Sequence, residues 1–568
     1  MDRNIRPTKI IYLSPSKARE VLLGNDCFTT IDLPAYFDFS AILRHAAKCV
    51  GKKSLDECTV PGCNPERLAG VNLDVITNKD GHYGVRPLTI PNPYLYYMMV
   101  RDICSPKAWK SLRECFRLYA HPHIQACAIP VVNISDSPEP FTAATTILNW
   151  WERIEQQSIE LSLRYRYMFI TDITNCFGQI NPESIAWALA RKDTPHATDS
   201  NASLAAAIQR YLRAMQQGRN IGVPQGSTLF SLIGEIILGY ADMLLARDIA
   251  AAQERGVLPA GLEYEVLRYV DDYRIFCNDR DALDHISYLL QHILESLNFR
   301  MNTSKTRTTS QIITDSIKPD KAFYIFNTPI ESKQPYLDAD GKEQRRRTYD
   351  FDGFQKHLLF IHEFSRRFPD SGQLVRQLEE FSHRLEEHLK PREVTYSETI
   401  VDFDNGGKRT TELVTCELPG QIVENIPVMV AICTDIAACN LRAARNALKV
   451  ASQLLAAMPR KMGAKKKEVI GLMYRKLIRI PNSGFIQVWL QNITHTSDDW
   501  SATPSPYDMP LCRLVARQPV SLWDNSWLLP SLTEAFPQDS IIDRKALSAT
   551  GQILATRYRP FADPYYGA

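Results

Sequence analysis

Two adjacent aspartates, Asp271 and Asp272, stand between apolar, β-prone runs in the stretch RYVDDYRIFC. Aspartate pairs are common in turns, because the side chain hydrogen-bonds its own backbone, so a plain β-hairpin accounts for the pattern. Paired carboxylates at a tight turn are also a ligand set for hard divalent cations such as Mg²⁺. The second interpretation predicts a third carboxylate elsewhere in the chain.

Asp172 meets that expectation. It ends the apolar stretch RYRYMFITDI, a predicted buried strand, where a charge is costly unless it binds a metal ion or is paired. Between this strand and the Asp271 hairpin, residues 222–227 read GVPQGS and lead into a predicted helix. Such a loop suits close approach of the backbone to a nucleotide. The three elements together predict a nucleotide and metal site.

These segments resemble the successive palm motifs of reverse transcriptases. The resemblance rests on the strand with Asp172, the loop 222–227, the hairpin 269–272 and the stretch LNFRMNTSKT with Asn302, Lys305 and Thr306. It implies an α+β right-hand polymerase, with fingers and palm, over about residues 70–330.

The resemblance also implies the chemistry, which is phosphoryl transfer assisted by two Mg²⁺ ions, for which Mn²⁺ can substitute. Asp172 and Asp271 are expected to hold both ions. The carbonyl of Ile173 adds a ligand, and Asp272 has a lesser role.

Further residues are expected to contact the incoming nucleotide. Phe177 falls where the family places a steric gate against the ribose 2′-hydroxyl, although an aromatic after a strand is often simply core. Gln225 and Gly226 would contact the nucleotide and the templating base, unless Gly226 merely permits a turn. Arg86 resembles the fingers arginine that grips the triphosphate, with Lys79 as a partner or as a solvated lysine.

Three residues are expected near the reacting ends. Tyr269 and Val270 lie beside the primer terminus in the family's arrangement. Lys305 is either a general acid that protonates the leaving pyrophosphate or a surface lysine.

The elements that position these residues predict four parts. We expect an N-terminal helical extension at 1–70, reverse-transcriptase fingers and palm at 71–330, and a polar connection at 331–350. An all-α C-terminal domain of thumb or helical-repeat type follows at 351–568, in which a β-prone interruption at 394–423 suggests an inserted hairpin.

Composition sets broader limits. A chain of 568 residues with 45% hydrophobic content should form more than one domain, and a net charge of +2 neither demands nor excludes nucleic acid. The 13 cysteines show no repeated C-x-x-C spacing, which predicts reduced thiols rather than zinc or disulfides. The N-terminus lacks a long apolar segment, so we expect a cytoplasmic protein without a membrane anchor.

The surroundings of the palm are similar to those of bacterial antiphage reverse transcriptases of the abortive-infection and defence-associated kind. This implies DNA synthesis from dNTPs on a noncoding RNA, primed by a DNA 3′-hydroxyl or a protein, often within a homo-oligomer or with a second polymerase subunit. Two alternatives remain, a template-independent or protein-templated nucleotidyl transferase and an idle RNA-binding scaffold. The basic runs PRKMGAKKKE, YRKLIRI and EQRRR either bind RNA or DNA or are solvated faces.

Overall fold

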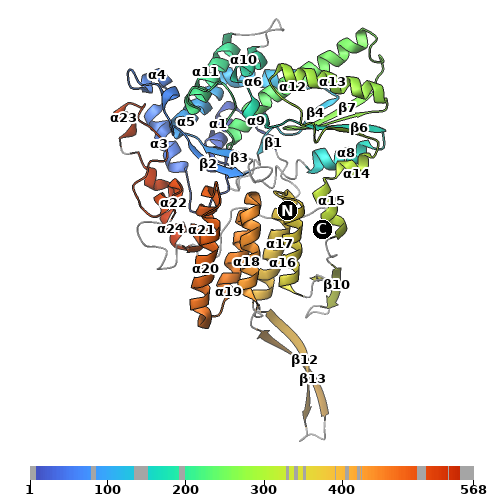
Figure 1. Cartoon of the computed structure of the whole chain (residues 1–568), viewed down its shortest axis with the longest axis vertical. Coiled ribbons are helices and arrows are strands. Elements are labelled where there is room, and N and C mark those ends of the chain that lie inside the picture. Colours follow the sequence, from blue (N-terminus) through green and yellow to red (C-terminus); the bar gives the residue numbers. More distant parts are fainter. Residues whose placement is uncertain are drawn as a thin grey trace.

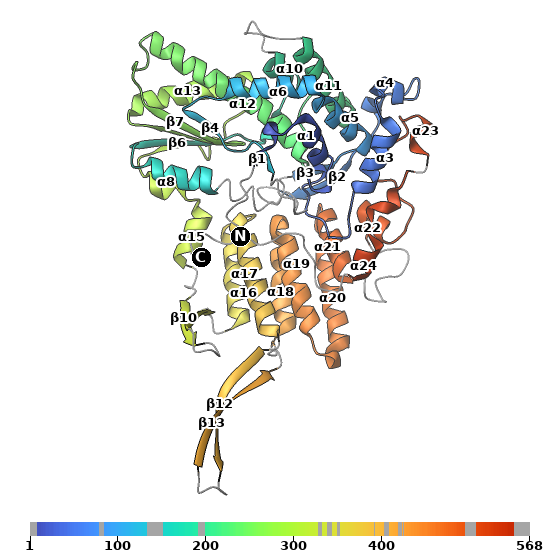
Figure 2. The same ribbon diagram turned by 180° about the vertical axis from the view of Figure 1, so that it is seen from behind.

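The computed structural model describes residues 8–78, 85–132, 151–190, 199–327, 332–337, 343–348, 353–390, 392–402, 408–418, 423, 425–494, 507–534 and 536–549. Figure 1 shows an upper body that contains the N-terminal helices and a sheet, with a row of helices beneath it. A long hairpin projects from the lower end of that row, and the reverse view in Figure 2 shows the same arrangement.

The predicted catalytic residues lie on a five-stranded sheet with the strand order β4-β7-β8-β6-β9. The strands are β4 (Ile124–Ala126), β6 (Tyr167–Asp172), β7 (Tyr264–Tyr269), β8 (Asp272–Cys277) and β9 (Arg307–Thr309). β8 pairs antiparallel with β7 on one side and with β6 on the other. The predicted strand with Asp172 therefore adjoins the predicted hairpin.

Alternation along the strands gives the sheet two buried faces. Phe169 and Ile275 join the main core, in which α12 (Thr228–Glu254) and α13 (Arg280–Ser296) contribute many side chains. Met168 and Phe276 pack in a smaller core on the other face with Ile312. The helices η3 (Trp151–Gln156), α8 (Gln157–Leu161) and α14 (Ile312–Ser316) cover that second face.

α12 is the central helix of the upper body. By length and composition alone it could span a membrane, but 83% of its apolar window is buried within the protein. A helix that is hydrophobic on all sides is expected in the core of a large protein. Ser227 caps its N-terminus by accepting a hydrogen bond from the Phe230 amide, so α12 begins directly at the predicted nucleotide loop.

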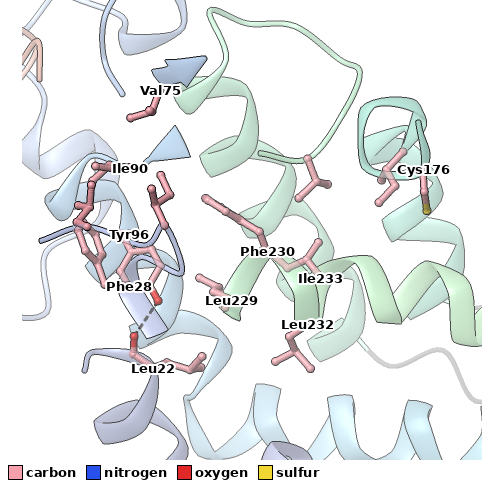
Figure 3. Close-up of a cluster of buried hydrophobic side chains, with 14 of the residues drawn as sticks. Leu22, Phe28, Val75, Ile90, Tyr96, Cys176, Leu229, Phe230, Leu232 and Ile233 are labelled. Atoms are coloured by element: carbon pink, nitrogen blue, oxygen red, sulfur yellow. Dashed lines mark hydrogen bonds between the residues drawn. The ribbon is translucent and has the colours of Figure 1, made fainter. Parts of the chain in front are cut away.

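The fingers contain two paired strands followed by a helix. β2 (Leu73–Asn78) and β3 (Val85–Ile90) pair antiparallel, and α5 (Pro93–Ile103) follows with Asn92 as its N-cap. Figure 3 shows Tyr96 of α5 beside Phe28 and near Phe230 of α12. The Tyr96 hydroxyl donates to the Leu22 carbonyl over 2.7 Å, so the N-terminal helices pack onto the fingers.

The C-terminal region is mainly helical. Its larger helices are α16 (Phe354–Arg367), α17 (Gly372–Leu389), α18 (Ile426–Cys439), α19 (Ala444–Ala457), α20 (Gly463–Leu477) and α21 (Gly484–Thr494). The description all-α is wrong, because β12 (Arg392–Asp402) and β13 (Lys408–Leu418) form the long projecting hairpin where an insertion was predicted. The connection also contains a hairpin, β10 (Ser332–Leu337) with β11 (Glu343–Thr348). Threonine and valine favour extended structure in both arms of the longer hairpin.

Residues 523–541 of the C-terminal region contact residues of the N-terminal extension and the fingers. The Trp523 indole donates to the Ile90 carbonyl of β3 over 3.1 Å, and the Val60 amide donates to the Trp527 carbonyl over 2.8 Å. Further along, the Asp38 amide donates to the Ile541 carbonyl. Trp523, Trp527 and Ile541 thus bond to the N-terminal extension and fingers, although the sequence analysis grouped this part of the chain with the helical region.

Candidate active site

The structure brings the three predicted aspartates to one place on the sheet. Asp172 ends β6 directly opposite Asp272 at the start of β8. The Ile173 amide donates to the Asp271 carbonyl over 3.1 Å, which joins the strand end to the turn between β7 and β8. Asp271 and Asp272 are partly exposed, whereas Asp172 is 9% exposed.

The turn itself has an unusual backbone. Val270 adopts φ of +54°, in the left-handed region that a β-branched residue rarely occupies. Such conformations cost about 1–3 kcal/mol and persist only where surrounding contacts impose them. Tyr269, before it, packs with the smaller core, and burial raises the pKa of its hydroxyl.

Asp172 has two side-chain partners from the segment after α13. Its Oδ2 accepts hydrogen bonds from Lys305 Nζ at 3.0 Å and from Asn302 Nδ2 at 3.2 Å. Its carbonyl also accepts from the Asn302 amide at 2.7 Å. Lys305 therefore lies at the carboxylate that is predicted to be catalytic, and both of its predicted roles stay predictions. Lys318 Nζ approaches Asp272 Oδ2 at 3.8 Å.

The donor set has the right chemistry for Mg²⁺, since three carboxylates and the Ile173 carbonyl are hard oxygen ligands. In the described part of the chain, no three His, Cys, Asp or Glu side chains form a cluster arranged to hold a metal ion. The Asp172 carboxylate points to Lys305 and Asn302 instead, so metal binding requires the carboxylates to converge. The assignment of Asp172, Ile173, Asp271 and Asp272 as ligands stays a prediction.

A buried ion network lies next to the turn. Arg268 of β7 has no exposed surface and donates from Nε to Asp242 Oδ2 at 2.8 Å. Its two terminal nitrogens donate to the two oxygens of Glu235 at 3.0 and 3.1 Å. One of them, Nη1, also lies 3.4 Å from the carbonyl of Val270, to which it donates. Arg268 thus connects the strained turn to α12, which carries both acids.

Two buried acids and one guanidinium leave one negative charge in excess. Burial raises the pKa of Asp242 to about 6, and Arg268 opposes that shift. Burial alone would lower the pKa of Arg268, but Asp242 and Glu235 raise it well above its usual value. The Tyr273 hydroxyl donates to Asp242 at 3.2 Å and completes the network.

The predicted nucleotide loop is held by its backbone. The Gln225 carbonyl accepts from the Thr89 amide of β3 at 2.6 Å, and the Gly226 carbonyl accepts from the Thr30 amide at 2.8 Å. Gly226 has φ of +122°, and a Cβ there would lie 2.7 Å from the Thr89 carbonyl oxygen. The glycine is therefore required by both its backbone conformation and its close neighbours.

Phe177 lies between the nucleotide loop and helix α12. Its carbonyl accepts from the Val223 amide at 2.8 Å, which fixes it to the loop before Gln225. A Cβ at Gly234 of α12 would lie 2.9 Å from the Phe177 ring, so the absence of a side chain there makes room for the aromatic. Both the gate and core interpretations agree with this packing.

Arg86 lies on β3 as the fingers prediction requires. Its Nε is buried, and no atom of the described residues accepts its hydrogen bond. An unsatisfied buried guanidinium nitrogen is costly, and a phosphate oxygen is a suitable acceptor. Lys79, its predicted partner, lies outside the described residues.

Sequence analysis missed the network of Arg268, Glu235 and Asp242. Glu235 and Asp242 stand seven residues apart in an apolar helix, so they lie on one face. Two carboxylates on one face of an apolar helix indicate that a cation is buried beside them. Arg268, on the buried strand β7, is the cation that pairs with these two carboxylates.

The fold and the site together define a nucleotidyl-transfer domain of the palm type. Residues 124–353 match the family described as "Reverse transcriptase (RNA-dependent DNA polymerase)". The chain therefore contains a reverse transcriptase domain, and as an enzyme it is an RNA-directed DNA polymerase, a nucleotidyltransferase. The match covers the sheet, α12 and all three aspartates.

Among solved structures, the chain is similar to two telomerases. The Candida albicans telomerase, solved with a TWJ fragment of telomeric RNA, is 13% identical, with 80% of this chain and 68% of that chain covered and a TM-score of 0.29. The apo telomerase of Candida tropicalis is 12% identical, with 81% and 72% covered and a TM-score of 0.28. No curated protein matches the chain.

Proposed function

We propose that this polymerase copies a partner noncoding RNA into DNA as part of bacterial antiphage defence in the cytoplasm. It extends a DNA 3′-hydroxyl or a protein primer with dNTPs, alone as a homo-oligomer or with a second polymerase subunit. The observation that carries the catalytic part is the junction of β6 with the β7–β8 turn. Asp172 ends β6, Asp272 begins the adjoining strand β8, and Asp271 lies in the turn before it, all within the matched domain.

Each residue has a defined task in this scheme. Asp172 and Asp271 would hold two Mg²⁺ ions, and bound Mg²⁺ would supply charge neutralisation at the phosphates and activation of the primer hydroxyl. Lys305, already at Asp172, delivers a proton to the leaving pyrophosphate.

The remaining groups select and hold the nucleotide. Arg86 grips the triphosphate from β3, where its buried Nε needs an acceptor. Gln225 and Gly226 contact the base, and Phe177 excludes the ribose 2′-hydroxyl. Deoxynucleotides are therefore preferred.

The defence role is supported by sequence pattern. The N-terminal extension, the RPLTIPNP stretch of the fingers and the long helical C-terminal third resemble defence-associated reverse transcriptases. RNA binding is supported by the basic run at 460–467, where Arg460, Lys461 and Lys465 are exposed.

The test is to purify the chain with its bound nucleic acid, supply each dNTP or NTP with Mg²⁺, and sequence any product. We expect DNA complementary to the bound RNA, and no detectable product from Asp271→Asn. Asp281→Asn, an exposed aspartate at the start of α13, is the matched control and should retain synthesis.

The outcomes separate the alternatives. DNA of a sequence unrelated to the bound RNA would indicate a template-independent or protein-templated transferase. RNA binding without any synthesis would indicate a scaffold. Full synthesis by the Asp271 variant would reject the metal assignment.

A further inference from the structure

The segment 29–33, named here the strap, passes along the nucleotide loop. The Thr30 amide donates to the Gly226 carbonyl over 2.8 Å. A Cβ on Gly226 would lie 3.5 Å from Ile31 Cγ1, so the strap contacts this glycine through both backbone and side chain. The strap precedes the matched domain in sequence and belongs to the N-terminal extension.

The next residue of the strap contacts the C-terminal helices. Asp32 Oδ2 lies 2.8 Å from Arg445 Nε, and Arg445, on α19, is only 6% exposed. Arg445 is also 3.7 Å from Glu379 of α17, and its guanidinium lies 6.0 Å from the centre of the Trp489 ring of α21. Side chains from two neighbouring helices therefore contact the arginine that receives Asp32.

The nucleotide loop is held between two supports. On one side the Thr89 amide of β3 bonds to the Gln225 carbonyl, and on the other Thr30 bonds to Gly226. Because Thr30 and Asp32 are only two residues apart, a displacement of α19 reaches Gly226 through two peptide units. The covalent path between the two contacts is therefore short.

We propose that Asp32 and Arg445 are positioning residues for the incoming nucleotide, through which the C-terminal helices set the place of Gln225 and Gly226. The proposal rests on the proposed function of these two residues as nucleotide contacts. It predicts that the ion pair affects affinity for dNTP more than the chemical step, because neither residue touches the aspartates.

The test compares Asp32→Asn, Arg445→Lys and the double variant in steady-state synthesis with varied dNTP. We expect the KM for dNTP to rise about 3- to 10-fold in each single variant. We expect kcat to stay within about 2-fold, and the double variant to match the larger single effect because the residues act as one unit. Arg445→Lys keeps the charge but loses the planar fork.

Asp435→Asn is the matched control. Asp435, on α18, also pairs with a cation, Lys476, at 2.6 Å and with His362 at 2.9 Å, and these partners lie on the outer helices. It should leave the KM for dNTP unchanged. Thermal unfolding of all variants shows whether they are folded, and the dNTP-induced shift of Tm with Mg²⁺ gives a binding readout without turnover.

Three results would overturn the proposal. The first is that Asp32→Asn leaves both the KM for dNTP and the dNTP-induced shift of Tm unchanged. The second is that the effects of the two single variants on KM add in the double variant. The third is that the variants lower kcat together with a matching loss of Tm. If the wild-type chain neither binds dNTP nor makes polymer, the proposed function fails and the proposal fails with it. An active wild type with an unaltered Asp32 variant overturns only the positioning role.

Discussion

Arg268 is a buried charge with partners on several sides. It is fully buried, satisfies two carboxylates at once and reaches the carbonyl of Val270. A guanidinium suits this task because its planar fork serves both acids, whereas a lysine ammonium serves one point. The arginine thus stabilises the strained turn that presents Asp271.

Replacing Arg268 with Met should strongly destabilise the protein. The change leaves Glu235 and Asp242 buried without their cation, and breaking such a pair costs about 3–5 kcal/mol. Urea unfolding followed by circular dichroism measures the loss.

Arg164→Met is the control for this prediction. Arg164 pairs with Glu263 at 3.3 Å with more than half of both side chains exposed. Removal of such a pair should cost at most about 1 kcal/mol. Equal losses in the two variants would contradict a structural role for the buried network.

At the scale of elements, the nucleotide loop shows how β3, the strap and α12 meet. Gly226 is enclosed by Thr89 and Ile31, and the next residue caps α12. The loop is therefore defined by contacts on three sides.

Gly226→Ala should weaken both stability and nucleotide binding. Its φ of +122° and the close Thr89 carbonyl make a side chain costly, by about 1–3 kcal/mol. Thermal unfolding and the KM for dNTP report the two effects.

Gly463→Ala in α20 is the matched control for that change. No atom lies within 4 Å of a Cβ at Gly463, so the substitution should be neutral or stabilising by about 0.4–1 kcal/mol. A neutral Gly226→Ala would show that the loop tolerates displacement.

Much of this site could be predicted from the sequence. Local sequence patterns predict three of its parts. These are the apolar strand before Asp172, the turn around Asp271 and the glycine-containing loop. The strap could not be predicted, because Asp32 and Arg445 are separated by more than four hundred residues and neither stands in a recognisable pattern. The return of 507–549 to the fingers is long-range in the same way.

At the scale of the whole molecule, the chain closes on itself. Trp523 is 1% exposed, donates to the Ile90 carbonyl and contacts the rings of Phe39 and Phe536. The segment around Trp523 is therefore part of the fingers' support.

Trp523→Ala should cost about 3–5 kcal/mol, because it removes a large buried side chain. Hydrogen exchange should show the loss at β3 as well as near residue 523, although they are far apart in sequence. Leu472→Ala, at a half-exposed position of α20, should change stability by about 0.5 kcal/mol or less. Protection of β3 that is unaffected by the tryptophan change would contradict this coupling.

α12 has a consequence for how such an enzyme can change over time. The same helix starts at the nucleotide loop, makes room for Phe177 at Gly234 and anchors the catalytic turn through Glu235 and Asp242. A substitution on its buried face therefore disturbs the packing around Phe177 and the support of the Asp271 turn together. Mutations in this helix are thus expected to change both regions of the proposed active site at once.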